Sequence, residues 1–242
     1  MDELKCFIGI MTLSGYDPKP GKLYFWNSQP DMANPVKNGM RRNRFEQIMQ
    51  FLHFSDTNKL DEKDKAWKVR PLMDQLQSRF LKYFMPEEDL DNDESMVKYF
   101  DKHGCKQFKR GKPIRFGFKM WSLNTKSGYL VNFNIYQCKN PKTTERDEKL
   151  YGKCTAPLLH MLRQFPPEKK NLPYKLYTDN LFTSVNLLEH MREKNVWCTG
   201  TIRDNRLPKD IPLSTKANFH KNANRGDSES VLDRNSGVMF IR

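Results

Sequence analysis

The sequence has no long hydrophobic run. It contains no stretch of about 18 consecutive apolar residues, the length that a helix needs to cross a bilayer, and it has no apolar core of a secretory signal peptide near its start. These absences argue against a membrane span and against secretion. We therefore expect no membrane partner.

Cysteine pairs of the metal-binding kind are also missing. The five cysteines are an odd number, and none of them belongs to a C-x-x-C pair. They are Cys6, Cys105, Cys138, Cys154 and Cys198. This pattern argues against a zinc knuckle or a dithiol redox site, and it predicts reduced thiols that are mostly packed in the interior.

Acidic residues are few in relation to basic ones. The chain has 29 Asp and Glu against 42 Lys and Arg, which gives a formal net charge of +13. A polyanion is the natural partner for such a charge, and nucleic acid is favoured over a lipid surface. The content of 37% hydrophobic and 12% aromatic residues excludes a disordered tail and predicts a globular fold with a proper core.

The first third of the chain is predicted to be mostly helical. Leu4, Phe7, Ile8 and Met11 recur at the spacing of one helix face. Similar apolar spacing predicts helices over residues 45–52 and 69–80, after the turn-forming stretch DPKPGK. We assign residues 1–87 to a helical N-terminal region of the dimerisation or DNA-binding type.

From about residue 88 the pattern changes to strands. The stretches FGFKMWSLN and GYLVNFNIYQ predict a hairpin joined by the turn TKSG, and DLDNDESMVKYF is the candidate for a preceding strand. A helix near 156–165, a strand ending at Asp179, another helix and the strand VWCTGTI follow. The order is typical of an α/β (α+β) fold with a mixed sheet, whose first strand lies centrally beside the strand that ends at Asp179.

This topology predicts that two distant acids meet. Asp93 belongs to the first strand and Asp179 ends the later one, so the two carboxylates are expected at about 4 to 6 Å, where they repel unless a cation lies between them. Mg²⁺ suits such a pair, and two-metal phosphoryl transfer is the chemistry it implies. Two simpler interpretations remain open. Asp179 is also placed to cap the following helix, and the tripeptide Asp91-Asn92-Asp93 resembles the D-x-D motif of glycosyltransferases.

Basic residues cluster in two places. Seven lie between residues 102 and 119 with no acid among them: Lys102, Lys106, Lys109, Arg110, Lys112, Arg115 and Lys119. Nearby aromatic side chains favour a surface that follows DNA phosphates, with a solvated hairpin face as the alternative. The second cluster, Arg41, Arg42 and Arg44, begins a predicted helix, where cations oppose the helix dipole unless a phosphate binds there.

Several stretches resemble the piggyBac-type transposases and their domesticated relatives. NDESMVKYFDKHGCKQFKRGKPIRFGFKMWSL is similar to the segment around the first catalytic acid of that family, and YTDNLFTSVNLL is similar to the second. GTIRDNR matches the family pattern G-T-x-R-x-N-R, and FIGIMTLSGYDPKPGKLYFW and RRNRFEQIMQFLHFSD resemble its helical N-terminal part. The resemblance covers residues 4–242.

The resemblance implies an RNase H-like catalytic core that uses three aspartates and Mg²⁺ (or Mn²⁺) to cut and join DNA. Asp93 matches the first acid and Asp179 the second, so both are expected to be catalytic and metal-binding. We expect residues 88–203 to form an incomplete core and 204–242 to begin an insertion region. The family's third acid has no match, because Asp204, Asp227 and Asp233 lie in a different context, and the chain is expected to be truncated at both ends relative to the family.

We therefore expect a nuclear, transposase-derived DNA-binding protein that does not cut DNA as this chain alone. A homodimer is compatible with the resemblance. Two alternatives remain open: an active transposase or nuclease if the chain is a fragment of a longer product, and a non-catalytic scaffold that binds other proteins. Metal-dependent cleavage would separate the first from the others, and absence of DNA affinity at low salt would indicate the second.

Overall fold

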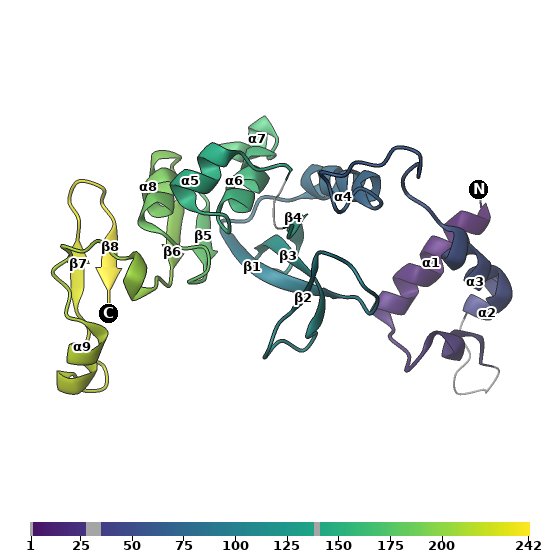
Figure 1. Ribbon diagram of the computed structural model, residues 1–242, viewed down its shortest axis with the longest axis horizontal. Coiled ribbons are helices and arrows are strands. Elements are labelled where there is room, and N and C mark those ends of the chain that lie inside the picture. Colours follow the sequence, from purple (N-terminus) through teal and green to yellow (C-terminus); the bar gives the residue numbers. More distant parts are fainter. Residues whose placement is uncertain (1, 28–34, 138–140) are drawn as a thin grey trace. The chain divides into compact units, whose positions relative to one another are not determined.

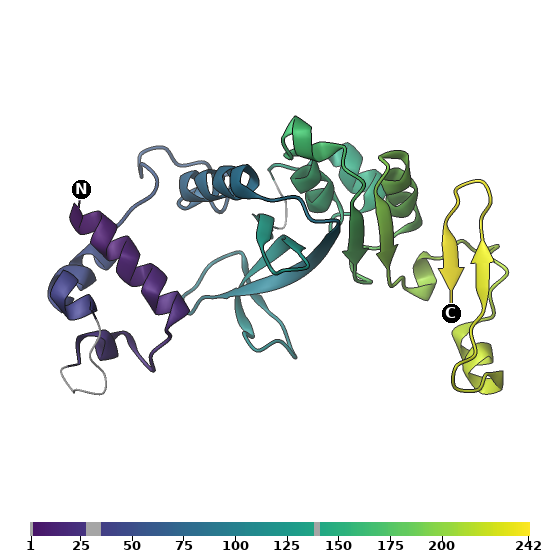
Figure 2. The ribbon, with the colours of Figure 1, turned by 180° about the vertical axis from the view of Figure 1, so that it is seen from behind.

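The computed structural model describes residues 2–27, 35–137 and 141–242 (Figures 1 and 2). The chain divides into two compact units, Met1–Asp56 and Thr57–Arg242. Within the described ranges, none of the helices combines the length and the apolar character that crossing a bilayer requires.

The first unit is a small helical assembly. Its elements are α1 (Asp2–Tyr16), the 3-10 helix η1 (Lys22–Trp26), α2 (Val36–Gly39) and α3 (Arg42–Phe51). Phe7 and Phe45 pack with ring centroids 5.0 Å apart, and the Trp26 indole N–H donates to the Met40 carbonyl at 2.7 Å. The helices predicted at the start of the chain and at residues 45–52 are thus confirmed as α1 and α3.

The second unit contains a mixed sheet, which has six strands in the part of the chain that the structure describes. They are β1 (Asp89–Lys98), β2 (Lys106–Phe108), β3 (Phe116–Thr125), β4 (Leu130–Ile135), β5 (Lys175–Thr178) and β6 (Trp197–Gly200). The order is β2-β3-β1-β5-β6, with β4 also paired to β3. β1 runs antiparallel to β3 and parallel to β5, so the predicted central strand, its parallel neighbour and the hairpin are all confirmed.

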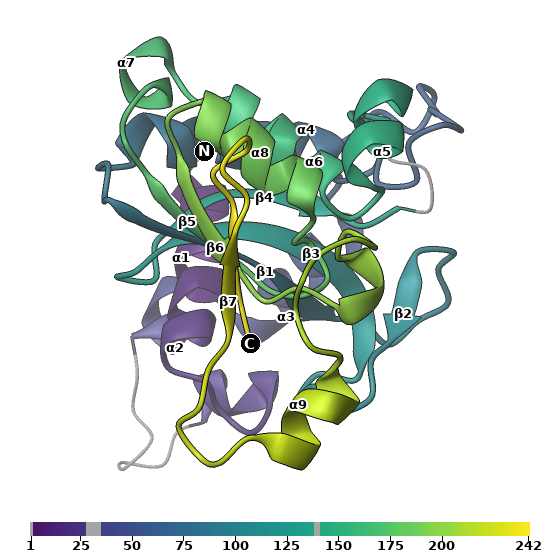
Figure 3. The same cartoon turned by 90° about the vertical axis from the view of Figure 1, so that its left-hand side faces the viewer.

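One face of the sheet packs on helices. In Figure 3, α6 (Ala156–Arg163) and α8 (Val185–Glu193) lie on the same side of β1 and β5. The core between them includes Leu90 of β1, Trp121 of β3 and Leu176 of β5, each 1% exposed. Burying each of these side chains contributes roughly 1.5–3 kcal/mol. This packing fixes which face of β1 is open to solvent.

Further helices and a hairpin complete the second unit. They are α4 (Arg70–Tyr83), α5 (Glu145–Tyr151), α7 (Pro167–Lys170), the 3-10 helix η3 (Asp204–Arg206), α9 (Lys216–Asn222), β7 (Ser230–Leu232) and β8 (Met239–Ile241). α4 lies with the sheet and packs on β4, where the Gln77 amide donates to the Phe133 carbonyl at 2.5 Å. The sequence had placed this helix in the region 1–87, whereas the compact units divide at Asp56. The limits 1–87, 88–203 and 204–242 stay predictions as functional domains.

The sequence predicts that the cysteines are reduced thiols and that most of them are packed in the interior. Cys105 is buried, and Cys6, Cys154 and Cys198 are free thiols of intermediate exposure. Burial raises the pKa of the Cys198 thiol to about 12, so this thiol stays protonated and inert at neutral pH. Cys138 lies outside the described residues.

Candidate metal and nucleic-acid site

The two predicted acids occupy neighbouring positions on paired strands, Asp93 within β1 and Asp179 just past the end of β5. Asp91 pairs with Tyr177 and Asn92 with Thr178 in the parallel ladder between β1 and β5. Asp93 follows on one strand, and Asp179 is the first residue beyond the other. Since neighbouring strands lie about 4.8 Å apart, the fold brings the two acids together as the topology predicted.

Asp91, which the sequence places only in a possible D-x-D motif, lies on the same face of β1 as Asp93. Side chains two residues apart face the same side of a strand, so Asp91 and Asp93 share one face. Partial withdrawal of the Asp91 carboxyl from water raises its pKa, and the negative charges of Asp93 and Asp179 raise it further. The effect of both charges indicates that the Asp91 carboxyl lies near Asp93 and near Asp179. The i, i+2 spacing of the D-x-D tripeptide already placed Asp91 beside Asp93 on one face of the strand.

Asp179 also has a local structural role. Its Oδ1 accepts a hydrogen bond from the Leu181 backbone N–H at 2.8 Å. It does not cap α8, because that position belongs to Ser184, whose hydroxyl accepts from the Leu187 N–H at 3.3 Å. The helix-cap interpretation of Asp179 is thus wrong, and its carboxylate keeps a second oxygen for other ligands.

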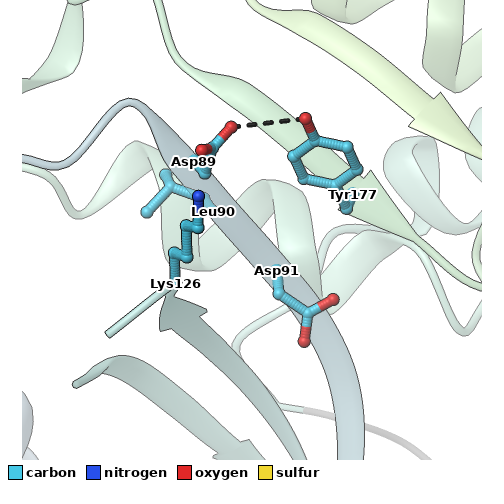
Figure 4. A pocket seen from close by; sticks show the side chains of 5 residues that line it. All are labelled: Asp89, Leu90, Asp91, Lys126 and Tyr177. Carbon is cyan, nitrogen blue, oxygen red and sulfur yellow. Dashed lines mark hydrogen bonds between the residues drawn. The ribbon is translucent and has the colours of Figure 1, made fainter. Parts of the chain in front are cut away.

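A shallow pocket adjoins this acidic face. Asp89, Leu90, Asp91, Lys126 and Tyr177 line a volume of about 310 Å³. Figure 4 shows the Tyr177 hydroxyl directed at Asp89, to whose Oδ1 it donates at 3.3 Å, while Asp91 points away from that pair. The pocket combines the carboxylates of Asp89 and Asp91 with apolar surface, and it continues the acidic face of β1 toward the start of the strand.

The donors fit a hard cation in kind. Carboxylate oxygens are the ligands that Mg²⁺ and Mn²⁺ prefer, and a bound cation would relieve the repulsion that Asp91 experiences from Asp93 and Asp179. In the described parts of the chain, no cluster of three or more His, Cys, Asp or Glu side chains is already arranged to hold a metal ion. The fit is therefore one of donor chemistry and position.

Beneath Asp93, Glu94 faces the opposite side of the sheet and forms a buried ion pair. The Lys119 ammonium lies 2.5 Å from Glu94 Oε2 and 3.9 Å from the Trp121 ring centroid. Burial alone would raise the pKa of the Glu94 carboxyl, but the ammonium groups of Lys119 and Lys109 together outweigh burial and lower it. Burial lowers the pKa of the Lys119 ammonium, and the attraction of Glu94 only partly offsets that effect.

The predicted basic residues between 102 and 119 do not all lie at the surface. Lys102, Arg110 and Arg115 are exposed, and Lys106, Lys109 and Lys112 are partly exposed. Lys119 is only 6% exposed and is held by Glu94, so its side chain does not reach the surface. The DNA-contact prediction for Lys119 therefore needs correction, because a phosphate would have to displace a buried partner.

The loop between β2 and β3 is attached beside the acidic site. Lys109 lies 3.5 Å from Glu94 Oε1, and the Lys112 ammonium donates to the Glu94 backbone carbonyl at 3.4 Å. Both contacts lie one residue beyond Asp93. A DNA-binding surface near the acid pair stays a prediction, because Lys109 contacts a carboxylate on the face opposite to Asp93.

The second basic cluster lies in the first unit at the start of α3. Arg41 is the residue before the helix, and Arg41 and Arg42 are exposed. Arg44 is paired with α1, since its guanidinium reaches the two carboxylate oxygens of Glu3 at 2.5 and 2.7 Å. The ion pair with Glu3 therefore explains Arg44 at the start of α3 by a structural role.

Comparison with known proteins gives consistent results. A family profile described as Transposase IS4 matches residues 1–242. The human PiggyBac transposable element-derived protein 2 is 38% identical over 241 residues, which are 99% of this chain and 40% of that protein. The human PiggyBac transposable element-derived protein 3 is 39% identical over 238 residues, 98% of this chain and 39% of that protein. The chain thus spans about two fifths of the length of these relatives.

A solved structure extends the comparison to the fold. A piggyBac transposase, determined in a synaptic complex with hairpin DNA, superimposes with a TM-score of 0.75 and 20% identity over 96% of this chain and 47% of that one. The agreement confirms the RNase H-like mixed-sheet core. With the profile match over all 242 residues and the similarity to the two human proteins, these findings show that the chain belongs to the piggyBac-type transposase family.

Proposed function

We propose that this chain binds DNA and holds a divalent cation between Asp93 and Asp179. The observation that carries the proposal is the register of β1 and β5. Asn92 pairs with Thr178, and the two acids are the next residue on each strand. The same two acids match the first two catalytic segments of the family. The cation would be Mg²⁺ or Mn²⁺, and it would supply electrostatic stabilisation of phosphate oxygens when bound.

The chain's own residues account for the DNA contact. The exposed cations Lys102, Arg110 and Arg115 lie on the segment that Glu94 attaches to β1 through Lys109 and Lys112. A phosphate backbone lying on this segment would pass beside Asp93. The charge of +13 supports binding that weakens steeply as salt is raised.

We propose further that these 242 residues do not cleave DNA by themselves. In-line transfer with two metals generally needs another oxygen donor to hold the second ion, and only Asp93 and Asp179 match the acids of the family pattern. Asp91 shares their face, but it comes from the same strand as Asp93. The chain would therefore recognise DNA and bind one cation without completing the reaction.

A single titration series tests the proposal. Fluorescence anisotropy with a labelled duplex of about 30 base pairs, at salt concentrations from low to physiological, should give a linear fall of log affinity with log salt. Incubation of the same duplex, and of a hairpin-ended one, with Mn²⁺ should leave both intact. No binding at low salt would refute the DNA-binding function, and nicking that Asp93→Asn abolishes would refute the absence of cleavage.

A nuclear location follows from a DNA partner and is part of the proposal. A fluorescent fusion of the chain should concentrate in nuclei, and exclusion from nuclei would contradict it. A homodimer stays a prediction of the family resemblance, which sedimentation at micromolar concentration would decide.

A further inference from the structure

The turn Asp179–Thr183, which carries the second acid, has all of its backbone carbonyls hydrogen-bonded. The Asp179 carbonyl accepts from the Phe182 and Thr183 N–H groups at 3.2 and 3.1 Å. The Phe182 carbonyl accepts from the Thr155 hydroxyl at 2.8 Å. The remaining three carbonyls share one donor group. This turn belongs to neither a helix nor a strand, so its carbonyls depend on side-chain donors for most of these bonds.

That donor is the guanidinium of Arg206. Its Nη1 lies 3.1 Å from the Asn180 carbonyl, 3.1 Å from the Leu181 carbonyl and 2.9 Å from the Thr183 carbonyl. Hydrogen bonds from a charged donor are roughly twice as strong as neutral ones. Because the three carbonyls point at one nitrogen, they converge, and the turn is fixed in a curve around the cation.

Two neighbouring residues of the G-T-x-R-x-N-R stretch support the same turn. The Arg203 Nε donates to the Asn180 side-chain oxygen at 3.1 Å. Gly200 lies so close that a Cβ there would come within 2.4 Å of the Thr183 hydroxyl and 2.5 Å of the Thr178 hydroxyl. The absence of a side chain at Gly200 allows β6 to approach the turn, which brings Arg206 within reach. The sequence motif thus acts on a segment about 20 residues before it.

We infer that Arg206 is a positioning residue for Asp179. The link runs through the Leu181 N–H, which donates to Asp179 Oδ1 at 2.8 Å and belongs to the turn that the guanidinium holds. Without the guanidinium the turn loses the donor for three carbonyls, and the Leu181 N–H that holds the Asp179 carboxylate is no longer fixed in place. The inference rests on the proposed metal site for its functional consequence, whereas the positioning itself is independent of metal.

The test compares Arg206→Met with Arg206→Lys and the wild-type chain. Met keeps a long unbranched stem but has no donor, and Lys keeps the charge without the planar fork. Arg225→Met is the matched control, because Arg225 is an exposed arginine outside the turn. Two quantities are measured: amide hydrogen exchange at Leu181 and Thr183, and Mn²⁺ affinity from the electron paramagnetic resonance signal of the free ion.

We expect Arg206→Met to speed exchange at both amides at least about tenfold, while exchange in β1 and β3 stays unchanged. Its Mn²⁺ affinity should fall about fivefold or more, and Arg206→Lys should lie between it and the wild type. Exchange within twofold of the wild type, or unchanged Mn²⁺ affinity, overturns the inference. If Arg206→Met does not fold, Arg206→Lys decides by the same two quantities. If the wild type binds no Mn²⁺, the proposed metal site fails, while the exchange data still decide whether Arg206 holds the turn.

Discussion

Asp93 of β1 and Asp179, the residue directly after β5, lie side by side on two neighbouring parallel strands, each one residue beyond the pair Asn92–Thr178. They are far apart in the sequence, and only the central place of β1 in the sheet brings them together. Carboxylates in this arrangement repel each other unless a proton or a cation is shared. Most of the following predictions concern how that repulsion is relieved.

Divalent cations should stabilise the folded chain through both acids. With 10 mM Mn²⁺ and a dissociation constant of about 1 mM, linkage gives roughly 1.4 kcal/mol of extra stability, which is a rise of a few degrees in Tm. Asp93→Asn and Asp179→Asn should each remove this rise. Glu62→Gln, a change of an exposed acid away from the site, should keep it. A rise that survives in both Asn variants would place the cation elsewhere.

Asp91 should destabilise the fold when it is ionised. Its pKa is raised in the folded chain, so the folded state binds more protons than the unfolded state, and this carboxyl lowers stability as pH rises from below the ordinary Asp pKa to above the raised one. Asp91→Asn should therefore stabilise the metal-free chain at pH 7 by about 0.5 kcal/mol, a value kept small by solvent screening.

Urea unfolding at two pH values checks this prediction. The gain from Asp91→Asn should shrink toward zero at about pH 3, where the Asp91 carboxyl is largely protonated in both the folded and unfolded states. A stabilisation that is equal at both pH values would mean that charge repulsion is not its cause.

The Glu94–Lys119 pair should be costly to break on one side. Lys119→Met leaves the Glu94 carboxylate with only Lys109, 3.5 Å away, so the loss should lie near the lower end of the about 3–5 kcal/mol that breaking a buried pair costs. Glu94→Gln combined with Lys119→Met should recover most of that loss. Chemical denaturation of the two single variants and the double variant gives the coupling energy, and additive losses would show that the two groups act independently.

The exposed part of the basic segment should carry the salt dependence of DNA binding. Each of Arg110→Ala and Arg115→Ala should reduce the slope of log affinity against log salt by about 0.9, the share of one phosphate contact. Arg79→Ala, which removes an exposed arginine of α4, serves as the control. If all three variants have the wild-type slope, the segment does not contact phosphate.

The sequence predicted the convergence of Asp93 and Asp179 because topology follows from the order of the elements. It did not predict the inward direction of Lys119. On β3 apolar residues fall on both faces, since Phe118 and Met120 alternate with Trp121, so the pattern leaves the inward register undecided. The same limit applies to α1, in which Phe7 is buried while Ile8 is 55% exposed.

Other features depend on contacts that no local pattern contains. Asp91 was visible at i, i+2 from Asp93, but its repulsion with Asp179 exists only after β5 pairs with β1. Arg206 lies 27 residues after Asp179, and its three carbonyl partners are set by backbone directions within the turn. The apolar pattern of a strand specifies neither the repulsion between Asp91 and Asp179 nor the carbonyl contacts of Arg206.

The most direct test of a cation between Asp93 and Asp179 is iron-mediated cleavage of the protein itself. Fe²⁺ with ascorbate and peroxide generates hydroxyl radicals at a Mg²⁺-type site, and these cut the nearest backbone. The account predicts two cuts in the wild-type chain, near residues 93 and 179, both of which are lost in Asp93→Asn. Cuts at other places, or cuts that persist in that variant, would contradict it.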